Sequence, residues 1–462
     1  MGAVCLLSPA SAAGQEAGTS PWPQFQGGPG HAGFLEGGVP PPYRVRWELP
    51  APEGRALSGA VILDETVMTV GDGAVYGIDI ATGEIDWEVT RSGGPLSVPA
   101  VVAGGPGSPD LLLYLDGPPS GDDQGSDPEG SDLVAIDLAD RSERWRTSLD
   151  AQARTGVTVA GGIAYVGDQA GTLYAVGADD GEARWTVELA AAEDGCAAFP
   201  GMRIDAPIAV ADDVVLALGA NADDRASVVT AHAAATGECL WRRSPEIATS
   251  AASTPVAGGG RVVVAYADRV VRSLDARDGE QQWGSLLLTL VLPPNATALA
   301  AGAVFVADLG GGLYRLDVEL GARDWSHQLN EAVVRSSPVV SGETVLVGLN
   351  DGRLVAVDAG SGHLVWESRP APGLLGAIAI APDVLVAVRG GREAGLVAFE
   401  HDPDGRLLDV PPPTELEPGT TLARAGIAAV IVLAVVLVPG IWARRRVGSA
   451  FAEDADDDEE GA

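Results

Sequence analysis

Lysine is absent from this sequence, and all 29 of its basic residues are arginine. Aspartate and glutamate together number 64, which sets the formal net charge at −35. A surface of this charge repels phosphate backbones and anionic lipid headgroups, so it argues against nucleic-acid binding and favours a basic or cationic partner. The same composition also fits a salt-adapted or GC-rich genome, in which case it concerns solubility alone.

Cysteine is scarce, with three residues, Cys5, Cys196 and Cys239. This number excludes a disulfide-dense scaffold and a cysteine-based zinc site. In an oxidising compartment, Cys196 and Cys239 can form one bridge, which would close a loop of about 40 residues and stabilise the fold by a few kcal/mol. The alternative is two buried free thiols.

Histidine is also rare, and its spacing predicts no metal site. The five residues are His31, His232, His327, His363 and His401. They form no pair with ligand spacing such as His-x-x-x-His. The acidic stretch 122–132 does not match the alternating acids, sixth-position glycine and distal glutamate of a calcium loop. We therefore assign no metal ligand and no catalytic residue.

One long apolar run stands near the C-terminus. Residues 425–443 form an uncharged run of nineteen residues, long enough as a helix to cross a bilayer core of about 30 Å. Arg444, Arg445 and Arg446 follow at once, whereas Arg424 alone adjoins the other end. The positive-inside bias therefore predicts a single transmembrane helix over 424–443, with the acidic tail 444–462 in the cytoplasm.

The region before this helix is then extracytoplasmic, which requires export. Residues 1–18 contain a short apolar stretch and an Ala-x-Ala-like site but no basic segment, so we interpret them as a truncated signal peptide. The proline-rich stretch 410–423 is interpreted as a semi-rigid stalk between a globular region, 20–409, and the membrane.

A repeat that ends in tryptophan fills the globular region. Its last copy includes "LVAVDAGSGHLVW", residues 354–366, and seven copies align on Trp87, Trp145, Trp185, Trp241, Trp283, Trp325 and Trp366. These tryptophans recur every 40 to 42 residues except across two insertions, 116–132 and 190–201. Glycine stands four residues before tryptophan in six copies, with Arg141 in the seventh, and aspartate stands eight before it in five. The glycine suits a tight turn with positive φ, and the aspartate can accept hydrogen bonds from turn amides.

The repeat predicts an all-β propeller. Short β-branched runs separated by glycine turns give four strands per copy, and one such sheet is too small to bury both faces alone. Radially packed sheets cover one another, so we expect four-stranded antiparallel blades around an axis. Each tryptophan should begin the outer region of its blade and wedge between neighbouring sheets, so we interpret these residues as packing groups and not as a ligand platform.

The two ends of the globular region complement each other. Trp47 stands in a strand that lacks the three preceding strands of a repeat, whereas the region after Trp366 has those strands without a fourth. If the Trp47 strand completes the last sheet, the ring has eight blades and no open edge at its closure. A seven-bladed ring is the alternative.

The aspartate, glycine turn and terminal tryptophan resemble the repeat of the pyrroloquinoline quinone (PQQ)-like propellers, a family that includes quinoprotein dehydrogenases and BamB-like assembly scaffolds. Trp22, Pro23, Phe25 and Gly33 resemble the entry motif of such proteins. The family's enzymes carry adjacent cysteines beside the quinone and a calcium ion held by acidic and amide side chains. This sequence has no adjacent cysteines. No cofactor-binding residue can therefore be transferred, and we expect no cofactor.

We predict a non-catalytic, membrane-anchored, extracytoplasmic propeller that serves as a scaffold for envelope or membrane proteins. The loops on one face of the ring, particularly the two insertions, are the expected contact surface. One alternative is a PQQ-dependent quinoprotein dehydrogenase that uses PQQ and calcium. Another is a ligand-sensing ectodomain, which would need a partner for its cytoplasmic output.

Overall fold

The computed structural model describes residues 22–93, 97–117, 130–189, 201–221, 226–245, 252–289, 291, 295–333, 335–391 and 393–408. The predicted signal peptide, stalk, transmembrane helix and tail lie outside these residues. Within the described ranges, no helix has the length and apolar character needed to cross a membrane.

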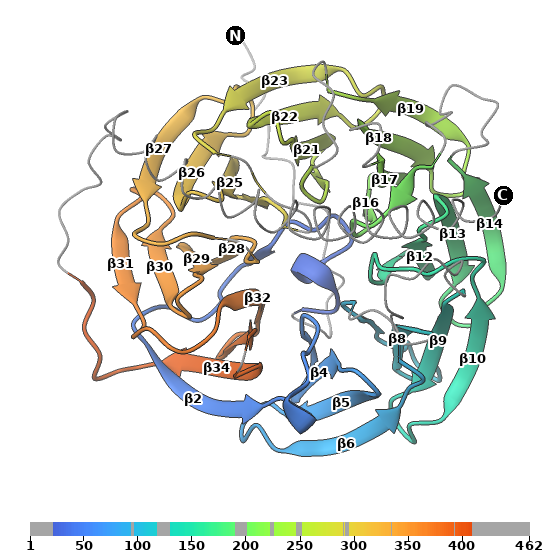
Figure 1. Cartoon of the computed structure of the whole chain (residues 1–462), viewed down its shortest axis with the longest axis horizontal. Helices are drawn as coiled ribbons and strands as arrows, with labels where there is room; N and C mark the ends of the chain where they lie inside the picture. Colours follow the sequence, from blue (N-terminus) through green and yellow to red (C-terminus); the bar gives the residue numbers. More distant parts are fainter. Residues whose placement is uncertain are drawn as a thin grey trace, which may run out of the picture. The chain divides into compact units, whose positions relative to one another are not determined.

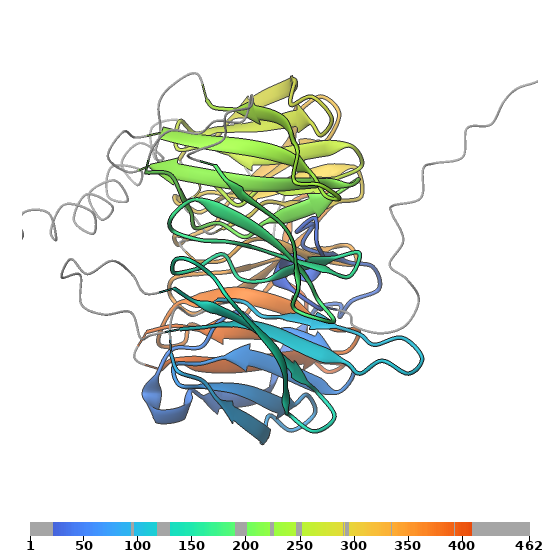
Figure 2. The same ribbon diagram turned by 90° about the vertical axis from the view of Figure 1, so that its right-hand side faces the viewer.

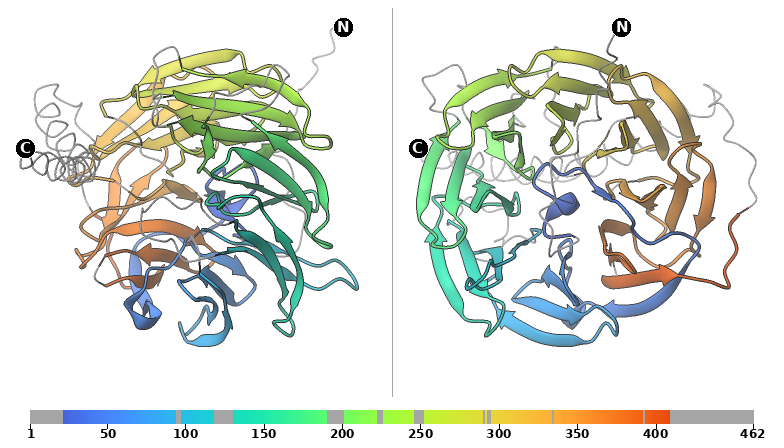
Figure 3. Two further views of the ribbon diagram at one scale, coloured as in Figure 1. Left: turned by 45° about the vertical axis from the view of Figure 1, so that its right-hand side comes forward. Right: turned by 180° about the vertical axis from the view of Figure 1, so that it is seen from behind.

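Eight sheets stand around one axis (Figures 1 and 3). From the inside outward, blades 1 to 4 contain β3 (Val61–Leu63), β4 (Thr66–Val70), β5 (Ala74–Asp79) and β6 (Ile85–Thr90); β7 (Ala100–Val102), β8 (Leu111–Asp116), β9 (Asp132–Asp137) and β10 (Glu143–Ser148); β11 (Thr158–Ala160), β12 (Ile163–Gly167), β13 (Thr172–Gly177) and β14 (Ala183–Glu188); and β16 (Ala209–Ala211), β17 (Val214–Asn221), β18 (Ala226–Ala233) and β19 (Cys239–Arg243). Blades 5 to 8 contain β20 (Val256–Gly258), β21 (Arg261–Ala265), β22 (Val270–Asp275) and β23 (Gln281–Leu286); β24 (Ala298–Ala300), β25 (Ala303–Ala307), β26 (Gly312–Asp317) and β27 (Arg323–Gln328); β28 (Val339–Ser341), β29 (Thr344–Gly348), β30 (Leu354–Asp358) and β31 (Leu364–Glu367); and β32 (Leu375–Ile380), β33 (Leu385–Arg389), β34 (Gly395–His401) and β2 (Tyr43–Pro50). The predicted eight-bladed, four-stranded propeller is confirmed, and the seven-bladed alternative is wrong.

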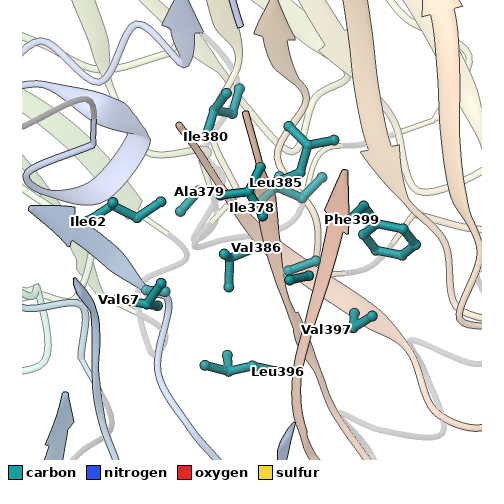
Figure 4. Close-up of a cluster of buried hydrophobic side chains, with 14 of the residues drawn as sticks. Ile62, Val67, Ile378, Ala379, Ile380, Leu385, Val386, Leu396, Val397 and Phe399 are labelled. Atoms are coloured by element: carbon teal, nitrogen blue, oxygen red, sulfur yellow. The ribbon is translucent and has the colours of Figure 1, made fainter. Parts of the chain in front are cut away.

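The ring closes between the two ends of the globular region, as predicted. Strand β2 pairs antiparallel with β34, and Trp47 lies opposite Ala398. Side chains of blades 8 and 1, including Ile62, Val67 and Phe399, share one buried cluster across the closure (Figure 4). Burial of this apolar surface ties the first blade to the last.

Apolar clusters also fill the seams between other blades. Between blades 1 and 2, for example, Met68 and Val75 pack with Leu112 and Tyr114. In blade 1, β5 is buried along most of its length on both faces, whereas the outer strand β6 alternates between exposed and partly buried residues. This gradient explains why the inner strands are continuous apolar runs in the sequence.

The turns use the repeat residues as the sequence predicts. Asp79 Oδ1 accepts hydrogen bonds from the backbone N–H groups of Ala81 (3.0 Å) and Thr82 (2.7 Å). Gly83 has a φ of 76°, in the left-handed region that favours glycine. Asp358 Oδ1 accepts likewise from the Ser361 N–H at 2.7 Å.

Four short elements fall outside the predicted repeat. They are β1 (Phe34–Leu35), which runs parallel to β28; β15 (Arg203–Ile204), which pairs with β17; and the 3-10 turns η1 (Phe25–Gly27) and η2 (Pro52–Gly54). Each is three residues or fewer, too short for a periodic signal.

Candidate protein-binding face

The repeat tryptophans lie on the outer strands, spread around the rim of the ring. Six of them donate an indole N–H to a turn carbonyl of the next blade: Trp47 to Ile80 (2.8 Å), Trp145 to Ala178 (3.2 Å), Trp185 to Ala234 (2.9 Å), Trp241 to Ala276 (2.9 Å), Trp283 to Val318 (2.8 Å) and Trp325 to Ala359 (3.0 Å). Each of these rings lies against the turn glycine of that next blade. Such residues join neighbouring sheets and do not converge on a common ligand.

Trp87 and Trp366 pack differently, because no turn glycine of the next blade lies against their rings. The guanidinium of Arg141, at a φ of 66°, lies 4.7 Å from the ring centre of Trp87. A cation stacked on the indole replaces the glycine contact at this seam. Trp366 instead meets Tyr43 edge-on, with ring centres 5.1 Å apart.

Residues 22–35, the hub segment, cross the centre of the ring (Figure 1). Oxygen atoms of the hub accept backbone N–H groups from the middle residue of the inner strand of blades 1 to 7, in chain order. The pairs are Trp22 with Ile62 (2.8 Å), Pro23 with Val101 (2.7 Å), the Gln24 side chain with Val159 (2.6 Å), Pro29 with Val210 (2.7 Å), Gly30 with Ala257 (2.8 Å), Ala32 with Leu299 (2.7 Å) and Gly33 with Val340 (2.7 Å). Inner strands have no neighbour on their axial side, so the hub satisfies groups that would otherwise be unpaired at the axis.

Trp22, Pro23, Phe25 and Gly33 stood out in the sequence, but their place on the axis of the ring was not predicted. The hub also buries polar side chains at the axis, including Gln24, Gln26 and His31. Polar residues spaced among glycines in this stretch are the feature of the sequence that could have indicated the hub.

His31 lies fully buried in the hub between two blades. Its Nδ1 lies 3.4 Å from the carbonyl oxygen of Pro255, and its Nε2 lies 3.3 Å from Thr158 Oγ1. A carbonyl only accepts, so Nδ1 carries the proton and Thr158 donates to Nε2. Burial lowers the pKa of His31 from 6.5 to about 4. The ring therefore holds this imidazole in its neutral form.

This pKa predicts a pH-dependent stability. The unfolded chain takes up a proton near pH 6.5 and the folded chain only near pH 4, so His31 stabilises the fold at neutral pH and progressively less as the pH falls between these values. The loss amounts to about 3 kcal/mol between pH 7 and pH 4. Urea unfolding of wild-type protein and of His31→Asn at several pH values measures this loss. Asparagine is chosen because it tolerates the left-handed φ of 59° at this position. An equal slope in both proteins would contradict the assignment.

The two predicted insertions leave the ring on the same face. Connections in an antiparallel blade alternate between the two faces of the ring, which Figure 2 shows edge-on, so the described ends of β8 and β14, from which the insertions start, lie on one face. Residues 118–129 and 190–200 lie outside the described part of the chain. Their flanking residues define what we call the insertion face.

An ionic network, in which Asp116 is buried and Arg146 and Asp132 are partly exposed, fixes both ends of the β8–β9 link. Arg146 Nη1 lies 3.1 Å from Asp116 Oδ2, at the end of β8, and 2.9 Å from Asp132 Oδ2, at the start of β9. The hydrogen bond to Glu143 and those to the two aspartates raise the pKa of Arg146. One guanidinium therefore clamps the two strand ends where the link begins and finishes.

Arg91 also lies beside Asp116 and so supports the clamp that Arg146 forms. Its side chain is fully buried and donates to the carbonyl oxygens of Gly71 (3.1 Å) and Leu115 (2.9 Å). Its Nε lies 3.8 Å from Asp116 Oδ1. Burial lowers the pKa of Arg91, and Asp116 opposes that shift. Arg91 has no counterpart in the other copies of the repeat, so the sequence did not predict this network.

The chain that follows the second insertion is also hydrogen-bonded to the ring. Strand β15 pairs with β17, and the Ile204 N–H donates to the carbonyl of Asp168 at 3.0 Å. Cys239 lies on β19, the outer strand of the same sheet, and is disulfide-bonded. Because Cys196 and Cys5 lie outside the described residues, the Cys196–Cys239 pairing stays a prediction.

The residues present do not suit a quinone with calcium. The hub segment fills the axis, with Trp22, Gln24, Gln26 and His31 buried there. Across the described ranges, no three histidine, cysteine, aspartate or glutamate side chains gather as metal ligands would. The buried Asp168 and Asp308 each accept a hydrogen bond from a tyrosine hydroxyl, at 2.9 Å and 2.8 Å. Those bonds occupy carboxylate oxygens that a cation would need.

A family model described as "Outer membrane protein assembly factor BamB" matches residues 129–221 and 225–373. Curated relatives carry the same description. The protein from Yersinia pestis is 24% identical over 65% of this chain and 71% of its own length. The one from Burkholderia pseudomallei is 28% identical over 37% of this chain, a match that spans 47% of that relative's length.

Solved structures share the fold at low sequence identity. BamB from Moraxella catarrhalis is 16% identical with a TM-score of 0.55, covering 78% of this chain and all of that one. A quinohemoprotein alcohol dehydrogenase from Pseudomonas putida is 13% identical with a TM-score of 0.62, covering 85% and 82%. The propeller alone follows from these likenesses, because assembly factors and dehydrogenases both have it.

Proposed function

The family model matches just over half of the chain, so the chain belongs to this family of PQQ-like propellers. We propose that it is a non-catalytic scaffold that binds other proteins of the cell envelope. The clamped insertion face carries this proposal. Binding loops act best when a rigid framework positions them, and Arg146 ties both ends of the β8–β9 link to that framework.

The names of the curated relatives support a role in assembling envelope proteins. An assembly factor brings other proteins together and needs surfaces more than a reaction centre. In this chain the axis is filled by the hub segment, so binding is left to the faces and the rim. The net charge of −35 favours partners with basic surfaces.

The proposed site of action is the outer side of a membrane. The apolar stretch 424–443 would anchor the chain as a single-pass helix, and the stalk 410–423 would hold the propeller away from the lipid. The tail 444–462 would then face the cytoplasm. Signal cleavage and the predicted Cys196–Cys239 bridge belong to the same extracytoplasmic location.

Affinity capture from native membranes tests the scaffold. We expect the full-length chain to capture a reproducible set of envelope proteins, and a variant lacking residues 118–129 to lose part of that set. A variant shortened by residues 105–108, in the β7–β8 turn on the opposite face, serves as the control. Capture of no reproducible partner, or an identical set from both variants, would contradict the proposal.

The quinoprotein alternative makes a different prediction. An enzyme of that type would show quinone absorbance after incubation with PQQ and calcium, and dye-coupled oxidation of an alcohol or sugar. We expect neither from the purified full-length chain, because the axis already holds the hub segment.

A further inference from the structure

Each blade ends in an outer strand, and one of these eight strands differs from the rest. Charged side chains stand on seven of them: β2, β6, β10, β14, β19, β27 and β31. Charges on an edge discourage another strand from pairing with it. Strand β23, with the sequence QQWGSL, carries none. On a chain with a net charge of −35, this edge is the exception.

The two most exposed large apolar side chains of the described residues lie on β23 and in a turn of the next blade. Leu286, the last residue of β23, is 57% exposed, and Leu320, in the β26–β27 turn of the next blade, is 75% exposed. The two sites belong to one seam, where Trp283 donates to the Val318 carbonyl (2.8 Å) and Arg323 donates to the Leu286 carbonyl (2.9 Å). Figure 1 shows β23 and β27 as neighbours on the rim.

Gly284 leaves the middle of this edge without a side chain. Its φ lies outside the left-handed region, so glycine is not required by the backbone there. An added Cβ would lie 3.3 Å from the Gln281 side chain and 3.3 Å from the Val270 side chain. In blade 1, Glu88 occupies the position that corresponds to Gly284. The tight contact with Val270 is one reason for glycine here, and a glycine in a strand can also mark close approach of another backbone.

We propose that the free edge of β23 takes up an extended, uncharged segment of a partner protein as a fifth strand of blade 5. Backbone groups of β23 other than the Leu286 carbonyl, which already accepts from Arg323, would hydrogen-bond the segment, and an aliphatic side chain would cover Leu286. A second copy of this chain is disfavoured, because two molecules of charge −35 would have to meet. The inference rests on the proposed scaffold function and names the class of segment that the scaffold binds.

The test uses the full-length chain in mild detergent with a fluorescent peptide of about ten residues that alternates threonine and valine. The same peptide with two central prolines is the probe control, because proline cannot donate to a strand. Fluorescence anisotropy measures binding to wild-type protein, Gly284→Glu, Leu286→Glu and Thr90→Glu. Thr90 on β6 corresponds to Leu286, so the last variant adds the same charge to another edge.

We expect the alternating peptide to bind wild-type protein and Thr90→Glu equally, and to bind Gly284→Glu and Leu286→Glu roughly tenfold more weakly. Urea midpoints of the variants check that each remains folded. Equal binding by all four proteins, or equal binding of the proline peptide, would overturn the inference. Light scattering that shows a dimer abolished by Gly284→Glu would overturn it too, since the occupant would be a second copy. Normal capture of envelope partners alongside either result would leave the scaffold function standing.

Discussion

Replacement of Trp241 with alanine is expected to lower the free energy of unfolding by about 3–5 kcal/mol. This tryptophan on β19 is 5% exposed, and its indole donates to the Ala276 carbonyl of the next blade at 2.9 Å. The ring also lies against Gly279, where an added Cβ would come within 2.7 Å of it. Truncation would leave a cavity at the seam and an unpaired carbonyl.

Urea unfolding followed by circular dichroism measures this loss. Leu240→Ala is the matched control, because the neighbouring side chain is 43% exposed and should contribute little. Trp241→Phe retains most of the ring and removes the donor, so it should lose about 1 kcal/mol for the hydrogen bond in addition to its smaller packing area. If Trp241→Ala cost no more than Leu240→Ala, the tryptophan would not join the blades.

Substitution of Gly30 with alanine should destabilise the ring by about 4 kcal/mol, through overpacking and the loss of buried hydrogen bonds. The new Cβ would lie 2.2 Å from the carbonyl oxygen of Ala257, so the hub backbone would have to move. The same stretch accepts N–H groups from Val210 and Ala257, at 2.7 Å and 2.8 Å. Displacement would weaken contacts to two blades at once.

Gly28→Ala is the control for this prediction. Its Cβ would meet no atom within 4 Å, and its φ of −171° is extended backbone that alanine adopts easily. We expect a urea midpoint close to that of wild-type protein for Gly28→Ala and a much lower one for Gly30→Ala. Similar midpoints for the two variants would mean that the hub segment is not packed at the axis.

The blades could be predicted because their signals are local. Every copy ends in its own tryptophan, and most copies carry the turn glycine and the aspartate. The strand that contains Trp47 lacked partners until the region after Trp366 supplied them. The closure could therefore be predicted, because one end supplied a strand without a sheet and the other a sheet without its fourth strand. Periodicity of this kind survives in the sequence even where one member, such as Arg141, departs from it.

The hub segment and the ionic clamp could not be predicted in this way. The hub touches seven blades mainly through backbone atoms, which leave no residue pattern beyond glycines and a few buried polar side chains. Arg91 and Asp116 meet across two blades, and Arg91 has no counterpart in the other copies, so no repeat points to their contact. The uncharged edge of β23 was readable, by comparing the final strand of every copy for charge.

These features divide the molecule by role. The hub and the seams make the ring rigid, and the clamp transmits that rigidity to the insertion face. A rigid ring with a filled axis suits a protein that holds others in position. The further contact proposed at β23 lies on the rim, where a segment could bind without displacing partners from the insertion face.

Closure of the ring by β2 and β34 is the central claim, and a designed cross-link tests it most directly. Arg44 and Glu400 are cross-strand partners in this pair, with their charged groups 2.7 Å apart. With cysteine at both positions, Arg44→Cys and Glu400→Cys, the spacing of antiparallel partners permits a disulfide. We predict that mass spectrometry of the oxidised, digested full-length protein will recover the two peptides joined. Recovery of both peptides only as free thiols or in other pairings would contradict the eight-bladed ring.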